Sequence, residues 1–171
     1  SAKTVTVTGL SLSNSNYSIA DQTTTANITP KVLTLTGLTA NNKVYNTSNT
    51  ASISSYGSLT GGASSDGDNK YYTGDSVSLV TTSASSSFAD ANAQSGKTVT
   101  VTGLSLSNSN YSIADQTTTA NITPKALTLT GLTANNKVYN TSNTASISSY
   151  GSLTGGASSD GDNKYYSGDS V

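Results

Sequence analysis

The chain repeats itself with a period of 94 residues, and no other feature limits the possible folds as strongly. Residues 1–77 align with residues 95–171 at a constant offset, so that Lys3 corresponds to Lys97. Three aligned pairs differ, and each change conserves size or polarity: Ala2 and Gly96, Val32 and Ala126, Thr73 and Ser167. One coil of a β-solenoid or one propeller blade spans roughly 20 to 50 residues, so this period indicates a small domain instead.

The best boundary signal within the repeat is the Thr-Pro-Lys segment at 29–31, which recurs at 123–125. Proline cannot donate to a sheet ladder and usually lies at a strand start or an edge. The length of 171 residues allows one domain or two. We predict three segments: the C-terminal part of a preceding repeat at 1–30, a complete repeat at 31–124, and the N-terminal part of a following repeat at 125–171.

Periodicity and composition both predict an all-β fold. Apolar residues alternate with Thr or Ser, as at Val5 and Val7, and a period of two is typical of strands with one buried face. The chain lacks Glu and Arg, which are good helix formers, and is rich in residues that favour strands and turns. We expect tandem small β-sandwich repeats, either immunoglobulin-like or β-grasp-like.

We expect many short strands within each repeat. Gly9 and Gly37 shift the phase of the alternation, and we interpret them as bulges or strand breaks. Alternating Leu, Ile and Val residues, Phe88 and some tyrosines form the expected thin core. The expected strands are 43–45, 51–55, 58–60, 71–72, 76–81, 85–89, 98–107 and 111–124, the last with a break.

The charge pattern argues against several classes of function. Eight Lys and nine Asp are scattered along the chain, whereas nucleic acid binding needs a concentrated basic footprint. No long apolar run or basic amphipathic helix is present, so we expect no membrane contact by this segment. Cys and His are absent, which removes the thiolate and the imidazole base. We therefore expect no nucleic acid partner, no cofactor, no catalytic residues and no enzymatic activity.

The densest polar stretch is 64–70, which reads SSDGDNK. The side chains of Asp66, Asp68, Asn69 and Asp75 could supply hard oxygen ligands for calcium. Their spacing does not match an EF-hand loop. The alternative is a hairpin turn in which Asp-Gly supplies the residues with positive φ, and we favour this turn.

Two other features suggest binding hypotheses. The five tyrosines of each repeat could form a platform on which sugars stack, although core or half-buried tyrosine is the commoner outcome. The ladder formed by Thr4, Thr6 and Thr8 could present hydroxyl groups to ice or to a glycan. We favour the simpler interpretation that these threonines form the solvent face of a strand.

Several motifs resemble a known family of repeats in their order and spacing. The chain is similar, across nearly the whole repeat unit, to the YDG and MBG-type repeats of large bacterial surface adhesins that resemble filamentous haemagglutinin. The motif that names this family, Tyr-Asp-Gly, reads Tyr45-Asn46-Thr47 here, and the SSDGDNKYY stretch looks like an insertion. The motifs that carry the resemblance are KALTLTGLTANNKVYN at 125–140, GDSVSL at 74–79, SFADANAQSGKTVTVTGLSLSNSNYSI at 87–113 and TTTANITP at 117–124.

The resemblance implies an extracellular β-domain at the bacterial cell surface, strung in tandem as a spacer in an adhesin stalk. Our first hypothesis is such a structural spacer, whose partners are neighbouring identical repeats in the same chain and which projects a binding region from the cell. A second is a self-assembling extracellular fibre, in which partial repeats of different molecules complete one another head to tail. A third is a glycan- or receptor-binding module.

Overall fold

A computed structural model describes all residues, 1–171, and contains sixteen β-strands and no helix, which confirms the all-β prediction. It has no helix that could cross a membrane. The strands are β1 (Ala2–Val7), β2 (Gln22–Asn27), β3 (Lys31–Leu33), β4 (Leu35–Thr36), β5 (Thr39–Ala40), β6 (Lys43–Val44), β7 (Ile53–Ser55), β8 (Ser58–Leu59), β9 (Leu79–Val80), β10 (Ser85–Phe88), β11 (Gln94–Thr102), β12 (Ser105–Leu106), β13 (Tyr111–Ile113), β14 (Gln116–Thr123), β15 (Thr130–Ala134) and β16 (Ile147–Ser152).

The chain forms two compact units, each built from segments that are distant in sequence. The first unit contains Ser1–Thr34, Leu59–Val80 and Ser105–Ala114. The second contains Leu35–Ser58, Thr81–Leu104 and Asp115–Val171. The three segments predicted from the repeat stay a prediction, and we use "central copy" below for the sequence repeat at 31–124.

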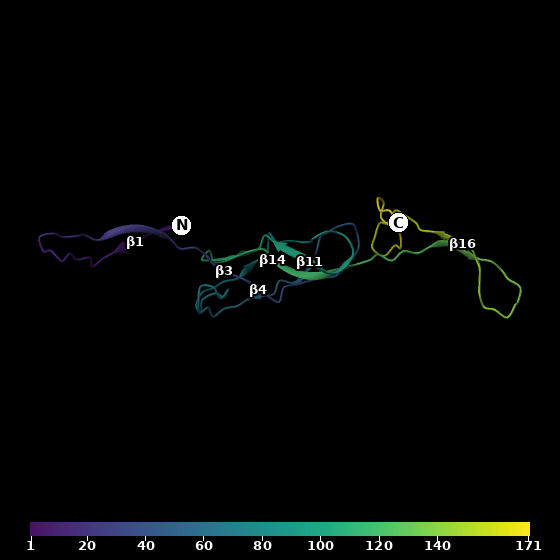
Figure 1. Ribbon diagram of the computed structural model, residues 1–171, viewed down its shortest axis with the longest axis horizontal. Coiled ribbons are helices and arrows are strands. Elements are labelled where there is room, and N and C mark those ends of the chain that lie inside the picture. The colour runs from purple at the N-terminus through teal and green to yellow at the C-terminus, as the bar shows by residue number, and fades with distance from the viewer. The chain divides into compact units, whose positions relative to one another are not determined.

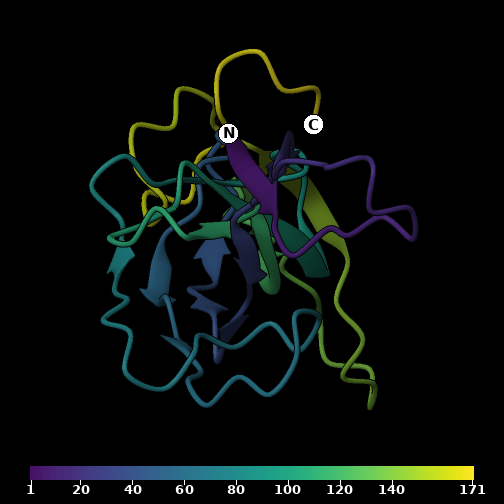
Figure 2. The ribbon, with the colours of Figure 1, turned by 90° about the vertical axis from the view of Figure 1, so that its left-hand side faces the viewer.

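The second unit contains the largest sheet, a four-stranded sheet with the order β10-β11-β14-β6. Strand β11 pairs antiparallel with β10 and β14, and β14 pairs parallel with β6. The sheet curls into a half-barrel (Figure 1 and Figure 2). Along β11, Lys97, Val99 and Val101 share the buried face. Every second residue is therefore buried, as the alternation in the sequence predicts.

The core of the second unit lies against this sheet. Phe88 is the largest fully buried residue. Its burial should stabilise the fold by about 1.5–3 kcal/mol, the usual contribution of a large apolar side chain. Three partly buried residues, Ala40, Tyr45 and Ile53, pack against the core cluster. The buried members of the cluster are Ala51, Phe88, Val99, Ala120 and Ile122.

One charged side chain, Lys97, is buried beside this core. Its ammonium group donates to the carboxylate of Asp90 and to the backbone oxygen of Asn92 at 2.8 Å. Hydrogen bonds from the ammonium group are needed here because an unpaired buried charge would be strongly destabilising. No buried side-chain nitrogen or oxygen lacks a hydrogen-bond partner.

Glycines end several strands, as the phase shifts in the sequence predicted. Gly9 has φ of 74° and follows the end of β1, while Gly37 has φ of 82° and separates β4 from β5. Both glycines lie outside the strands, so they are strand breaks, and glycine adopts the positive φ there at no steric cost. Gly103, with φ of 72°, likewise divides the expected strand 98–107 into β11 and β12. The strand expected at 71–72 is wrong, since Tyr71 forms only an isolated bridge.

The first unit contains three two-stranded sheets. Strands β1 and β2 form an antiparallel pair, coloured purple in Figure 1, and β9 pairs antiparallel with β12. Strand β3 pairs parallel with β13, so that Leu33 lies opposite Ile113 and Lys31 opposite Tyr111. Leu33 and Tyr111 are buried, which gives this unit its own small apolar centre.

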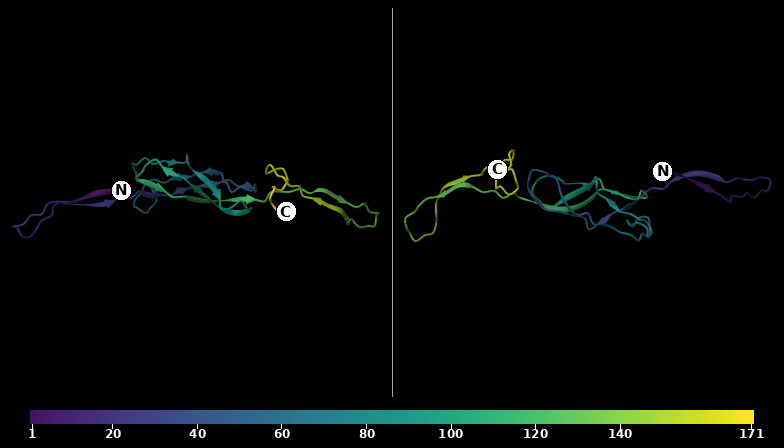
Figure 3. Two further views of the ribbon diagram at one scale, coloured as in Figure 1. Left: turned by 90° about the horizontal axis from the view of Figure 1, so that it is seen from above. Right: turned by 180° about the vertical axis from the view of Figure 1, so that it is seen from behind.

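Equivalent strands pair in the same register in different copies of the repeat. Lys3 lies opposite Ala26 in the β1–β2 pair, as Lys97 lies opposite Ala120 in the β11–β14 pair. The β15–β16 pair (Figure 3) repeats the register of β5 and β7, including the same irregularity one residue before its end. These pairings therefore follow from the local sequence.

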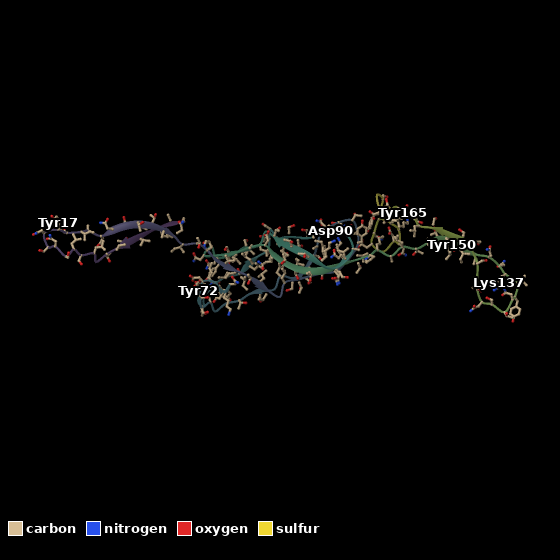
Figure 4. The ribbon with its side chains drawn as sticks, viewed as in Figure 1. Tyr17, Tyr72, Asp90, Lys137, Tyr150 and Tyr165 are labelled. Atoms are coloured by element: carbon tan, nitrogen blue, oxygen red, sulfur yellow. The ribbon has the colours of Figure 1, made fainter.

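The burial of equivalent residues is not the same. Val99 and Val101 are 0% exposed, whereas their counterparts Val5 and Val7 are 40% and 43% exposed. Tyr17 lies in the loop between β1 and β2 and is largely exposed (Figure 4), although its counterpart in β13 is buried. The same hairpin is thus buried or exposed according to what packs against it.

Candidate functional site

The predicted site lies in one closed loop, which we call the Asp-rich loop and define as residues 61–75. A parallel bridge between Gly61 and Tyr71 closes it, and Tyr71 donates its backbone N–H to the oxygen of Thr60 at 3.0 Å. The tyrosine ring covers Gly61 so closely that a Cβ there would lie 2.7 Å from it. Asp66 and Gly67 do lie in a turn, as expected, but the hairpin is wrong: the bridge between Gly61 and Tyr71 is parallel, and Asn69 and not Gly67 has the positive φ, 58°.

Asp68 organises the interior of the Asp-rich loop. One carboxylate oxygen accepts the backbone N–H groups of Ser64 at 2.7 Å and Ser65 at 3.3 Å. The other accepts the N–H of Lys70 at 3.1 Å and the ammonium group of Lys31 at 2.8 Å. The hydrogen bond from Lys31, followed by the one from Ser64, holds the pKa of this carboxyl well below its usual value.

Lys31 ties the Asp-rich loop to the beginning of the central copy. It directly follows Pro30 and lies in β3, and its ammonium group also donates to the backbone oxygen of Ser65. The same ammonium group is 5.1 Å from the centre of the Tyr72 ring, which is within range of a cation–π interaction. The lysine therefore contacts a carboxylate, a carbonyl and an aromatic face at once.

Two tyrosines engage the remaining acidic groups. Tyr72, labelled in Figure 4, donates its hydroxyl to Asp66 at 2.9 Å, and this hydrogen bond is the main cause of its raised pKa. Tyr111 donates to the carboxylate of Asp75 and accepts the backbone N–H of Tyr72 at 3.0 Å. Burial, followed by the bond to Asp75, raises the pKa of Tyr111.

The second unit contains a copy of this loop at 155–169 with the same internal contacts. Lys125 lies 2.9 Å from Asp162 and 5.3 Å from the ring centre of Tyr166. Tyr166 donates to Asp160 at 2.9 Å, and the backbone N–H of Ser158 and the ammonium of Lys125 lower the pKa of Asp162. The loop therefore takes its shape from its own sequence and the preceding lysine.

All four predicted calcium ligands lie in the Asp-rich loop, but the structure does not gather their side chains around one point. Asp66, Asp68 and Asp75 each accept hydrogen bonds from this chain, and Asn69 provides the left-handed residue of the turn. No group of three or more His, Cys, Asp or Glu side chains is arranged to hold a metal ion. Calcium binding at these residues stays a prediction. The hydrogen bonds that these carboxylates accept hold the loop in its closed conformation.

Sequence reasoning missed Lys31 and Tyr111 as members of this site. Both are far from the loop in sequence, and β3 and β13 bring them to it. A signal for Lys31 was present, because a lone lysine after proline starts the repeat unit and recurs at 125. No local pattern distinguishes Tyr111 from the other tyrosines.

Near-identical tandem copies of a small β-structured unit define the class of this molecule, a tandem-repeat β-protein. Comparison with known families matches residues 29–120, more than half of the chain, to the YDG domain, and the chain belongs to that family. No curated protein and no solved structure matches it.

The segment Tyr45-Asn46-Thr47, which stands where we expect the motif that names the family, forms a strained turn. Thr47 has φ of 64°, a left-handed conformation that a β-branched residue rarely adopts. The side chain of Asn46 accepts the backbone N–H of Ser48 at 3.2 Å, as an aspartate would in the same place. Asn46 therefore makes a hydrogen bond that an aspartate could also make, whereas Thr47 lacks the conformational freedom of glycine.

Proposed function

We propose that this chain is a structural spacer segment of a secreted or cell-surface bacterial adhesin, which projects a binding region away from the cell. The observation that carries the proposal is that the core cluster consists of residues of the central copy alone, from Ala40 to Ile122. A unit that buries its own core can be repeated along a chain without a further partner. Near-identical copies and membership of the YDG domain family support the same function.

In this proposal each copy is a small β-sandwich, immunoglobulin-like or β-grasp-like, located outside the cell. It supplies length and shape and performs no chemistry, and it needs no cofactor. Support comes from the way the acidic side chains are used. Lys31 binds Asp68 and Tyr72 binds Asp66, so these groups hold a loop in place.

Small-angle scattering and negative-stain imaging of the 171-residue chain test the spacer function. We expect an elongated particle whose maximum dimension grows in equal steps when one or two further 94-residue copies are added. A compact particle, or a dimension that does not grow with copy number, would contradict the proposal. An antibody against the chain should label intact cells of the source organism before they are permeabilised.

A second candidate, a fibre assembled from second copies of this chain, is supported by the exposed face of the β1–β2 hairpin. Ile28, which directly follows β2, is 71% exposed, whereas Ile122, its counterpart in the central copy, is 1% exposed and packs in the core. Residues 125–171 of another molecule carry the counterparts of Ala51, a member of the core cluster, and of Ile53, which packs against it. They lack a counterpart of Phe88, so we expect weak association.

Sedimentation velocity over a wide range of concentration tests the fibre. Growing species that disappear in the Ile28→Asp variant would support assembly through this hairpin. A single monomeric species at every concentration would exclude it.

A further inference from the structure

Tyr45 of the central copy contacts two residues of the following copy, and all three residues lie in the second unit. Its hydroxyl donates to both carboxylate oxygens of Asp169, each at 3.1 Å. Its ring meets the ring of Tyr166 edge to face, with the centres 6.0 Å apart and the planes at 74°. A phenol that donates to a carboxylate forms a charge-assisted hydrogen bond, which is stronger than a neutral one.

The repeat provides an internal comparison for this contact. Tyr139 occupies the position of Tyr45 in the following copy and has the same neighbours in sequence. It is 86% exposed and forms no aromatic pair. The local sequence therefore does not produce the contact, which requires the next copy along the chain.

The two residues that Tyr45 contacts also differ in burial from their counterparts in the preceding copy. Asp169 and Tyr166 are half-buried, whereas their counterparts Asp75 and Tyr72 are exposed. The tyrosine thus covers the carboxylate and the ring that it touches. Burial, followed by the hydrogen bond to Asp169, raises the pKa of Tyr45, which agrees with this geometry.

Both sides of the contact are held in place by other interactions. Tyr45 directly follows β6, donates its backbone N–H to the oxygen of Thr123 at 2.9 Å, and packs against the core cluster. On the other side, Tyr166 is fixed by its hydrogen bond to Asp160 and by the ammonium group of Lys125. Contacts between groups that are already ordered lose little conformational entropy on forming.

We propose that Tyr45 is a docking residue that binds the next copy of the repeat at Asp169 and Tyr166. The partner is the following repeat of the same chain, and the contact restrains the Thr-Pro-Lys connection at 123–125. This inference rests on the proposed spacer function and refines it, because a docked joint makes a spacer stiff. A loose joint would leave a flexible spacer, so the two proposals fail separately.

A copy in the middle of an array can accept this contact without losing its own. In the first unit, Asp75 uses one carboxylate oxygen to accept the hydroxyl of Tyr111. Its other oxygen accepts no hydrogen bond from a side chain of this chain. A carboxylate has about four lone-pair sites, so one aspartate can accept a phenol from its own copy and one from the preceding copy.

NMR spectroscopy of the 171-residue chain tests the joint, with Tyr139 variants as matched controls. We expect cross-relaxation between the ring protons of Tyr45 and Tyr166 in the parent chain and in the Tyr45→Phe variant, and none in Tyr45→Ala. The backbone N–H of Asp169, which donates to the oxygen of Tyr166, reports local opening. Its exchange should rise about tenfold in Tyr45→Phe, because one hydrogen bond to a charged group is lost.

The controls separate docking from a general loss of structure. Tyr139→Phe and Tyr139→Ala should leave the exchange of Asp169 unchanged. If Tyr45→Ala disturbs the core signals of Phe88, then Tyr45→Phe and Asp169→Asn, which keep the size of each side chain, decide the outcome. Absence of the ring contact, or equal effects of the Tyr45→Phe and Tyr139→Phe variants, would overturn the proposal.

Discussion

The carboxylate of Asp68 shows how one side chain can hold a surface loop together. It accepts two backbone N–H groups from the start of the loop, one from its end, and the ammonium group of Lys31. All four donors favour the charged form of the carboxyl, and they lower its pKa. The closed state of the loop is therefore linked to pH.

The sign of this linkage follows from the lowered pKa. The stabilisation is fully present above the unfolded pKa, about 4, and is lost as the pH falls through the folded value. We expect the protection of the Ser64 N–H, measured relative to the intrinsic exchange rate at each pH, to fall below about pH 4 in the parent chain. Asp68→Asn should exchange fast at every pH, whereas Asp21→Asn should behave like the parent. A loop whose opening is insensitive to acid would contradict this account.

Calcium provides a second test of the Asp-rich loop. Since its three carboxylates already bind a lysine, backbone N–H groups and tyrosines, we expect calcium to leave the thermal midpoint of unfolding unchanged relative to a chelator control. A rise in the midpoint that disappears in Asp75→Asn would instead support the calcium hypothesis for Asp66, Asp68, Asn69 and Asp75.

Thr47 offers a stabilising substitution. A β-branched residue in the left-handed region is strained by about 1–2 kcal/mol, and glycine removes that strain. Because glycine also increases the entropy of the unfolded chain, we expect Thr47→Gly to raise the free energy of unfolding by up to about 1 kcal/mol. Urea denaturation, monitored by tyrosine fluorescence, measures this free energy. Thr141 also has a positive φ, 63°, but lies outside the core, so Thr141→Gly should leave the free energy of unfolding unchanged.

Among the strands, a comparison of the hairpins β1–β2 and β11–β14 distinguishes the effect of strand pairing from the effect of side-chain packing. Their registers are the same, but only β11 and β14 bury an apolar face against Phe88 and Ala51. Hydrogen bonds between two strands are therefore not enough to bury valine or isoleucine. An isolated two-stranded hairpin is marginally stable in water, and packing against further elements is what stabilises it.

A matched pair of substitutions measures the contribution of that packing. Ile122→Ala removes a fully buried side chain and should lower the free energy of unfolding by about 2–5 kcal/mol. Ile28→Ala changes the same sequence motif where the side chain is largely exposed and should have an effect within about 0.5 kcal/mol. Equal losses from both substitutions in urea denaturation would show that the β1–β2 hairpin is packed in solution.

For the chain as a whole, stability should be distributed unevenly along the sequence. The core cluster and the buried side chain of Lys97 lie in the central copy, whereas the strands β1, β2, β15 and β16 are exposed throughout. Regions with few buried apolar contacts open at low cost. The fold therefore predicts one cooperative region flanked by labile ones.

Amide hydrogen exchange measures this distribution directly. We expect the N–H groups of β11 and β14 to exchange more slowly than those of β1 and β2 by orders of magnitude. This difference is expected even though the equivalent strand residues of the two hairpins are identical except at one position, Ala2 and Gly96. Comparable protection of both hairpins in dilute solution would contradict this expectation.

Much of the fold could be predicted from residue order alone, because the relevant interactions are local. The alternation around Val99 predicts a strand with one buried face, and the phase shift at Gly37 predicts a strand break. The site was only partly predictable. The Asp-rich loop was identified, but its hairpin was wrong, since the side chain of Asp68 shapes the turn through contacts that Asp-Gly propensity does not contain.

Comparison of the copies separates what the sequence determines from what the tertiary structure decides. Asn69 and Asn163 have the same positive φ, and Lys31 and Lys125 bind equivalent aspartates, because these contacts depend on nearby residues that are identical in both copies. Burial and long-range partners differ between identical sequences: Tyr45 binds Asp169 while its counterpart stays in solvent. A sequence specifies how each strand and turn is formed, but the apolar face that it buries depends on which other segment packs against it.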